Sequence, residues 1–224
     1  MWMIAHSRLA VGTWSAITGH DPTCLRCTAH LPESQRHCLW TCSQVQPVWR
    51  AICLLLSRVG VCQGYVTWGA VSWLLQFEGP HLFFEGEPAD PVFSLGVGTY
   101  FGGTLSMIPL SVHDATEQSR DPSFAIIAAI TLWCIWKARC MHVLSHESSS
   151  PEDTLRIIWS ELIHTLRSQW DAAQGDSRAA EQRRFAFLRA WGGSSQFFHY
   201  DRGFLVWHYS LLDWLILHAS HQPP

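Results

Sequence analysis

The feature that most constrains this chain is a group of cysteine and histidine residues near its N-terminus. Cys24, Cys27, His37 and Cys42 follow the pattern C-x2-C-x9-H-x4-C. Zinc takes thiolates and imidazoles in tetrahedral sites, and a two-residue spacing lets one tight turn supply two thiolates. A structural zinc site contributes on the order of 10–16 kcal/mol of apparent binding free energy, enough to decide whether a short polar segment folds. The pattern predicts structural Zn²⁺ on these four residues, with no open position for catalysis.

Other readings of this segment stay open. His30 and Cys38 lie within it, and either is able to replace one of the four ligands. The cysteines are also able to serve only as small buried residues that pack against apolar neighbours. Eight cysteines raise the further question of disulfides, but disulfide frameworks belong mainly to short secreted chains with a signal peptide. The first eight residues lack a basic start followed by a long apolar stretch. We therefore expect an intracellular protein, nuclear or cytoplasmic and not secreted.

Composition limits the class of protein further. The chain has 224 residues, of which 48% are hydrophobic and 15% charged, with a formal net charge of −3. These values suit one folded domain or two small ones, and they exclude wholesale disorder and an overall basic coat for nucleic acid. The chain holds one lysine, Lys137, fourteen arginines and no asparagine. Such a skew fits codon bias in a GC-rich gene or a reading frame that is no longer under selection.

Apolar residues recur at helical spacing over most of the chain, which predicts a mainly α fold. A first helix is expected after an N-cap at Ser43, with one apolar face. That face comprises Val45, Val48, Trp49, Ile52, Leu55 and Leu56. Further helices are expected at 66–76, 121–143, 151–170, 177–191 and 204–218, and the third of these starts after Ser150. The tryptophans Trp133, Trp136, Trp159 and Trp170 are expected in the core. The apolar runs 124–136 and 204–219 are expected to be buried helices and not membrane spans, because one is short and polar residues interrupt the other.

The predicted organisation has three parts. Residues 1–78 form a zinc-binding domain, a small zinc-stapled lobe, and residues 121–224 form a helical bundle. Residues 79–120 lie between them as a loop-rich linker or insertion with room for a short strand, because six glycines fall between Gly79 and Gly103.

The same residues carry a resemblance to a known family. The run from Cys24 to Cys42, with Glu33-Ser34 before His37 and Val48-Trp49 after the last cysteine, resembles the zinc-binding region that follows the reverse transcriptase domain in non-LTR (LINE-type) retrotransposons. The upstream segment 9–12 is similar to the family's lead-in, with alanine at the usual proline. Residues 132–139, LWCIWKAR, resemble a later helix of the family, although Cys140 replaces its asparagine.

The resemblance implies a non-catalytic zinc-binding protein derived from a retrotransposon, which assists nucleic-acid engagement in the parent polyprotein. We expect no enzyme activity, because the polymerase's paired aspartates and a ribonuclease H carboxylate set are not found, and two-metal chemistry needs such clusters. RNA or DNA is expected to meet arginines near the cluster or further along the chain, and no membrane or small-molecule partner is expected. These arginines are Arg26, Arg36, Arg50, Arg183 and Arg184.

Two alternatives remain beside that prediction. The chain is also consistent with a helical protein-interaction module in which zinc is only a staple, or with a decayed fragment that has no function. The basic stretch from Arg178 to Arg189, interleaved with Phe185 and Phe187, suits either a surface that stacks bases or an ordinary solvated helix.

Overall fold

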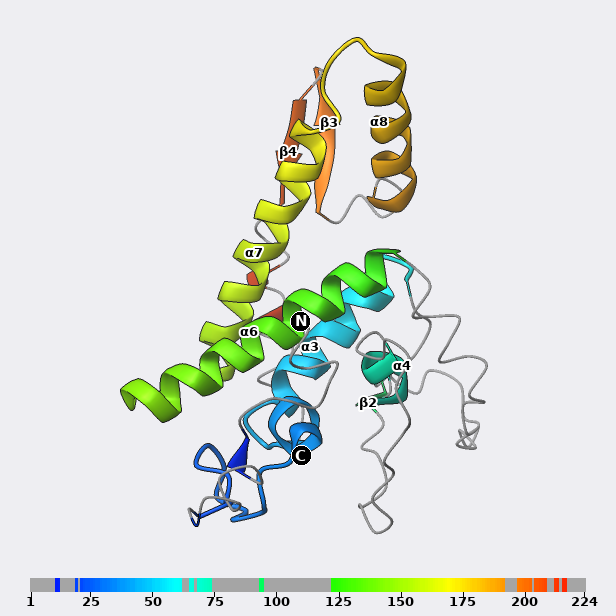
Figure 1. Ribbon diagram of the computed structural model, residues 1–224. Coiled ribbons are helices and arrows are strands. Elements are labelled where there is room, and N and C mark those ends of the chain that lie inside the picture. Colours follow the sequence, from blue (N-terminus) through cyan, green and yellow to red (C-terminus); the bar gives the residue numbers. More distant parts are fainter. Residues whose placement is uncertain are drawn as a thin grey trace, which may run out of the picture.

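The computed structural model of the chain describes residues 11–12, 19, 21–61, 65–66, 68–73, 93–94, 122–191, 197–202, 204–208, 212–213 and 215–216. Within these residues the fold is mainly helical, as predicted (Figure 1). The elements in chain order are η2 (His37–Thr41), α3 (Gln46–Arg58), β1 (Tyr65–Val66), α4 (Trp68–Trp73), β2 (Phe93–Ser94), α6 (Pro122–Ser145), α7 (Pro151–Asp171), α8 (Arg178–Trp191), β3 (Phe198–Asp201) and β4 (Phe204–Trp207).

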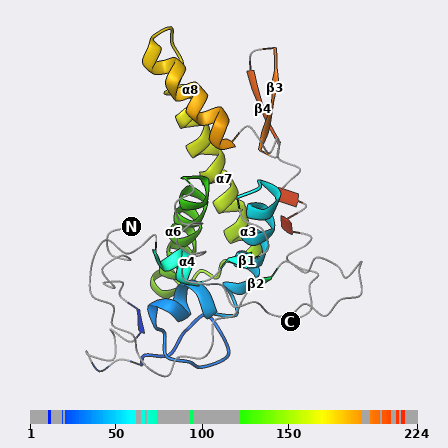
Figure 2. The same ribbon diagram turned by 90° about the vertical axis from the view of Figure 1, so that its right-hand side faces the viewer.

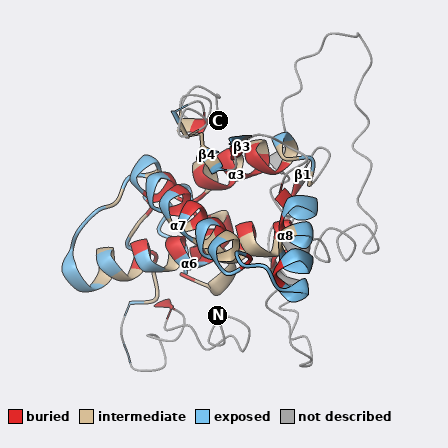
Figure 3. Cartoon of the chain, turned by 90° about the horizontal axis from the view of Figure 1, so that it is seen from above, coloured by how far each residue is buried: buried red, intermediate tan, exposed pale blue. Residues whose placement is uncertain are grey.

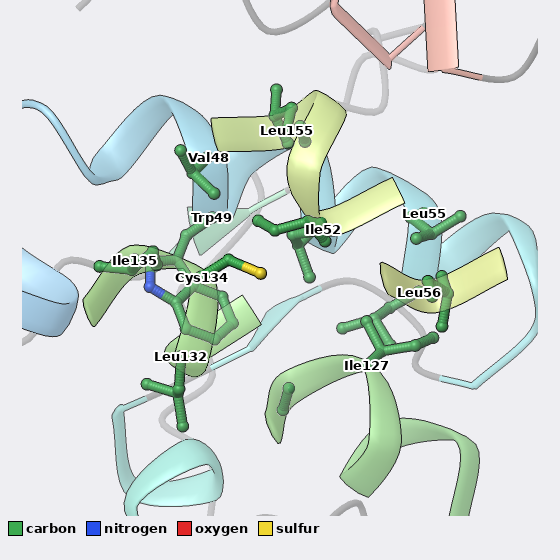
Figure 4. Close-up of a cluster of buried hydrophobic side chains, with 14 of the residues drawn as sticks. Val48, Trp49, Ile52, Leu55, Leu56, Ile127, Leu132, Cys134, Ile135 and Leu155 are labelled. Atoms are coloured by element: carbon green, nitrogen blue, oxygen red, sulfur yellow. The ribbon is translucent and has the colours of Figure 1, made fainter. Parts of the chain in front are cut away.

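Three helices, α3, α6 and α7, pack against one another and form the centre of the core. The predicted apolar face of α3 is confirmed, because all six of its residues are buried. Figure 4 shows α3 side chains such as Ile52 and Leu56 meeting Ile127 of α6 and Leu155 of α7. Each large apolar side chain that leaves water stabilises the fold by about 1.5–3 kcal/mol. The core therefore joins the N-terminal segment to the C-terminal helices.

The predicted start of α7 agrees with the structure, and the predicted start of α3 does not. Ser150 caps α7 in a full capping box, since its Oγ accepts from the Asp153 N–H at 3.0 Å and the Ser150 N–H donates to Asp153 Oδ2 at 3.1 Å. The predicted N-cap at Ser43 is wrong. Helix α3 begins at Gln46 without a side-chain cap, because the chain first turns at Cys42, whose carbonyl accepts from the N–H groups of Val45 and Gln46.

Helix α6 is apolar on nearly all sides. Of the described helices, it is the one that is long and apolar enough to cross a membrane by length and composition, and half of its apolar stretch is buried in this fold. Its Trp133 is 45% exposed, so the prediction that this ring lies in the core is wrong, whereas Trp136 is half-buried under the Arg139 guanidinium. A helix that is apolar all round has no periodic stripe to show which side faces the core.

The tryptophans of α7 follow the prediction more closely. Trp159 is buried, and Trp170 is half-buried against Phe187 of α8, with ring centroids 5.3 Å apart.

The C-terminal prediction of a helix at 204–218 is wrong over its first five residues. Strands β3 and β4 form an antiparallel hairpin in which Phe198 pairs with Trp207 and Asp201 with Phe204. One hairpin face packs inward, where the Phe198 ring stacks on Phe187 at 5.6 Å. The chain reverses through Arg202, whose φ of 48° is the left-handed value that tight hairpin turns require.

The predicted helix at 66–76 begins later than expected, and residues 74–76 lie outside the described part of the chain. Val66 belongs to β1, which pairs with β2 in register Tyr65 to Ser94 and Val66 to Phe93, and the helix α4 covers Trp68–Trp73. Strand β2 is the short strand for which the glycine-rich segment left room. The other residues of 79–120 lie outside the described part of the chain.

The cysteine loop and the C-terminal hairpin lie at opposite ends of the molecule. Figures 1 and 2 both place η2 and the cysteine loop at one end of the molecule, and α8 with the β3–β4 hairpin at the other. Figure 3 shows α7 with a buried inner side, whereas α8 is largely exposed. Any chemistry at the hairpin is therefore remote from the cysteine loop.

Candidate metal centre

Cys24, Cys27, His37 and Cys42 converge on one point, as the sequence pattern predicted. Each contributes one donor atom, all four donor atoms lie within 4.8 Å of one another, and all four residues are buried. Cys24 and Cys27 come from a loop that is closed by the Cys24 N–H donating to the Leu31 carbonyl and by a bridge between Thr23 and Pro32. The cluster can hold a metal ion.

The other two donors meet through an unusual turn. In an α-helix, residues five apart point about 140° away from each other, because each residue turns about 100°. Here His37–Thr41 forms the π-helix η2, and the Cys42 N–H donates to the His37 carbonyl at 2.9 Å. That i-to-i+5 bond places both ligands of the H-x4-C spacing on the same side of the turn.

The donor distances suit a tetrahedral ion. The sulfurs of Cys24 and Cys42 are 4.0 Å apart, and the Cys27 sulfur is 3.4 Å from Nε2 of His37. A tetrahedral zinc site with ordinary bond lengths has edges of about 3.8 Å between two sulfurs and about 3.6 Å between sulfur and nitrogen. The residues present therefore fit Zn²⁺ in size and in donor type.

The thiols of the cluster differ in acidity. The pKa of Cys24 is lowered to about 3, chiefly by the hydrogen bond from the Cys42 thiol, with smaller contributions from His37 and from the backbone N–H groups of Arg26 and Cys27 that together outweigh burial. Donating that hydrogen bond raises the pKa of Cys42, and burial raises the pKa of Cys27. Before a metal binds, Cys24 carries the anion while Cys27 and Cys42 keep their protons.

The imidazole of His37 is held by its other nitrogen. Nδ1 of His37 lies 3.3 Å from Oγ1 of Thr41, which leaves Nε2 facing the thiols. The His37 N–H donates to Oγ of Ser34 at 3.0 Å. Partners of this kind fix the tautomer and the orientation of a metal-binding histidine. Thr41 had not been predicted, and its position one turn after the histidine is the only sequence signal for it.

Helix α6 holds the segment that carries the metal cluster, residues 21–61 (the metal lobe), against the rest of the fold. Arg139 donates to both carboxylate oxygens of Glu33, from Nη2 at 2.7 Å and from Nε at 3.2 Å, and the Gly12 N–H donates to the same carboxylate at 2.9 Å. One turn later, His142 Nε2 lies 3.1 Å from the Leu25 carbonyl, between the two cysteines of the C-x2-C turn. Glu33 and Arg139 both belong to the motifs quoted for the family resemblance, but their pairing across the chain had not been predicted.

The pair also changes the acidity of the arginine. Burial lowers the pKa of Arg139, but the hydrogen bonds to Glu33 and the charge of that carboxylate outweigh burial, so the net shift is upward. Arg139 therefore keeps its charge inside the fold.

The two alternative ligands lie outside this cluster. His30 is exposed on a turn with a φ of 49°. The Cys38 thiol is buried outside the cluster, and burial raises its pKa to about 12, so it is a protonated packing residue. The geometry thus favours Cys42 over Cys38 as the fourth donor. Among the other cysteines, Cys53 and Cys134 are buried, Cys140 is half-buried and Cys62 lies outside the described residues.

The arginines proposed for nucleic acid fall into two groups. Arg26, Arg36 and Arg50 are half-buried around the metal lobe. Arg183 Nε donates to the Ala172 carbonyl at 2.9 Å, and Arg184 Nη1 donates to the Gly175 carbonyl at 2.8 Å. The second group therefore satisfies carbonyl groups just after α7, a capping role that does not depend on a partner.

Comparison with known protein families, with curated proteins and with solved structures found no match to this chain.

Proposed function

We propose that this chain is a non-catalytic zinc-binding protein, in which Zn²⁺ on Cys24, Cys27, His37 and Cys42 folds the N-terminal lobe. The observation that carries the proposal is the buried cluster of three sulfurs and one imidazole nitrogen, all within 4.8 Å. Three thiolates and one histidine are typical of structural zinc, because the protein fills all four positions and leaves none for substrate.

Elemental analysis of purified protein tests the zinc proposal. We expect one zinc per chain, lost in Cys27→Ser and retained in Cys134→Ser, since Cys134 is a buried cysteine of α6 outside the cluster. Cys38→Ser should also keep its zinc. A zinc-free protein whose stability is unchanged by Cys27→Ser would contradict the proposal.

We further propose that the lobe derives from the zinc-binding region of a non-LTR retrotransposon and assists engagement of RNA or DNA. The local charge of the lobe supports the engagement of RNA or DNA. Residues 21–61 carry four arginines against two carboxylates, one of them Glu33, which Arg139 neutralises. The lobe is therefore positive although the whole chain is not.

Phosphate contacts release counterions, so their number sets the salt dependence of binding. We expect affinity for a single-stranded RNA or a DNA duplex to fall steeply between about 50 and 200 mM salt. Arg26→Gln or Arg50→Gln should make that slope shallower by about one unit each. Arg58→Gln is the matched control on the far end of α3, where the arginine lies away from the cysteine loop.

Exposed aromatic side chains favour the second candidate, a zinc-stapled protein-interaction module. Phe185 is 70% exposed on α8 and Phe204 is 75% exposed on β4. This candidate predicts zinc binding without measurable, salt-dependent affinity for nucleic acid. A decayed, non-functional fragment predicts neither a cooperative thermal transition nor resistance to proteolysis, and both measurements need only the purified chain.

A further inference from the structure

Two histidines meet at the β3–β4 hairpin, at the opposite end of the molecule from the cysteine cluster. Nδ1 of His199 and Nε2 of His208 are 2.6 Å apart, and the two ring centroids are 4.9 Å apart. His199 is exposed and His208 is half-buried, so solvent reaches the pair. Neither residue takes part in the core.

The hairpin register explains why the two rings meet. His199 pairs with Val206, and His208 follows two residues later on the same face of the neighbouring strand. The His208 N–H donates to the Phe197 carbonyl at 2.8 Å, which extends the ladder past the end of β4 and fixes His208 in place. Diagonal residues on one face of an antiparallel pair lie within reach of long side chains.

The opposite face of the hairpin anchors this arrangement. The Phe198 ring stacks on Phe187 and meets the edge of Trp207 at 5.4 Å. The Arg167 guanidinium of α7 lies over the Trp207 ring at 5.5 Å. The two imidazoles therefore project from a packed scaffold, and little chain entropy remains to be lost when both bind one ion.

We propose that His199 and His208 form a second metal site, which binds a nitrogen-preferring divalent transition ion such as Ni²⁺ or Cu²⁺. Two imidazole nitrogens bound at about 2.0 Å lie about 2.8 Å apart at a right angle and about 3.3 Å apart at the tetrahedral angle. The observed 2.6 Å is closer to the right angle, which square-planar and octahedral ions use. Zn²⁺ in tetrahedral geometry requires the larger opening.

Binding of the ion replaces the hydrogen bond between the two rings without a net change in the number of protons. At 2.6 Å one ring donates its N–H to the bare nitrogen of the other. When the ion enters, the donating ring carries its hydrogen on the other ring nitrogen, so two neutral imidazoles present their lone pairs and no net proton is released. Water fills the remaining positions of the ion, which leaves the site open to an external ligand.

Calorimetric titration of the full chain with Ni²⁺, in the presence of equimolar Zn²⁺, tests the site. Ni²⁺ avoids the thiol oxidation that Cu²⁺ brings. Since even outer-shell partners change metal affinity by about 10-fold to 100-fold, loss of a ligand in His199→Gln or His208→Gln should weaken binding at least about tenfold. The double variant should be no weaker than either single one. His164→Gln, an exposed histidine of α7, is the matched control and should bind as the wild type does.

Unchanged Ni²⁺ affinity in both single variants would overturn the proposal. Nuclear magnetic resonance on the unmodified protein gives an answer that needs no variant. Substoichiometric Ni²⁺ should broaden the imidazole signals of two histidines and the methyl signals of Val206, which lies opposite His199. Broadening that spreads over the other histidines, or centres elsewhere, would equally overturn it.

Discussion

Replacing Arg139 by methionine would leave the Glu33 carboxylate inside the fold without its cation. The Glu33 side chain is 3% exposed and that of Arg139 is 9% exposed, so water replaces little of what is lost. The change removes two charge-assisted hydrogen bonds and keeps only the Gly12 N–H on the carboxylate. Removing one partner of a buried ion pair costs about 3–5 kcal/mol, and two hydrogen bonds to a charged group account for a similar amount.

Urea unfolding of the metal-loaded protein measures this cost as the change in the free energy of unfolding. For a chain of this size each kcal/mol shifts the thermal midpoint by about 2–4 °C, so we expect a fall of about 6–20 °C. Lys137→Met is the matched control on the same helix. The Lys137–Glu161 pair is 3.6 Å long and nearly half exposed on both sides, and such pairs contribute about 0–1 kcal/mol.

A double variant separates the buried charge from the lost contact. Glu33→Gln combined with Arg139→Met removes the carboxylate charge, so it should be less destabilised than the sum of the two single variants. If Arg139→Met costs no more than Lys137→Met, the ion pair does not hold the metal lobe to α6 and the reasoning fails.

Three further substitutions and one metal titration have definite expected outcomes. In Gly12→Ala the new Cβ would clash with the Pro22 carbonyl oxygen, so thermal unfolding should show a loss of about 1–3 kcal/mol. In Thr41→Val the His37 ring loses its outer partner, and competition with a chelator should show zinc affinity about 10-fold to 100-fold weaker. Zinc binding should release about two protons near neutral pH, because the pKa of two cluster thiols is raised, and the zinc affinity should therefore rise with pH. Calorimetry in buffers of different ionisation enthalpy counts the released protons. Arg184→Ala should cost about 1 kcal/mol of stability and leave nucleic-acid affinity unchanged, because its guanidinium is bonded to carbonyl groups after α7.

The metal cluster could be predicted because its chemistry is local in sequence. The four ligands lie between Cys24 and Cys42, and their residue types and spacing already satisfy what zinc requires. The turn that joins the last two ligands could not be read in the same way. A spacing of five residues is compatible with a loop, and no residue type marks the π-helix that the structure shows.

The contact that joins the metal cluster to helix α6 could not be predicted from residue spacing. Glu33 and Arg139 are separated by 106 positions, and an isolated Arg on an apolar helix reads as a solvated residue. Helix α6 has the same ambiguity along its length, because apolar residues surround it. Only the packing of α3 and α7 decides that Leu132 and Ile135 are buried while Trp133 is exposed.

At the C-terminal hairpin, the sequence contained a strand signal, but the longer apolar run that follows it favoured a helix. Residues 204–219 form an apolar run long enough for a helix, and short apolar runs do not distinguish helix from strand. The distinguishing information lies upstream. Apolar and polar residues alternate from Phe198 to Asp201, and the sequence Arg202-Gly203 is typical of the two-residue connections of hairpins. The pairing of Asp201 with Phe204 agrees with that signal. Once the turn is placed there, Leu205 and Trp207 must face inward with Phe198, and His199 must face outward with His208. The hairpin register therefore decides both the aromatic packing that anchors the end of the chain and the pairing of the two imidazoles.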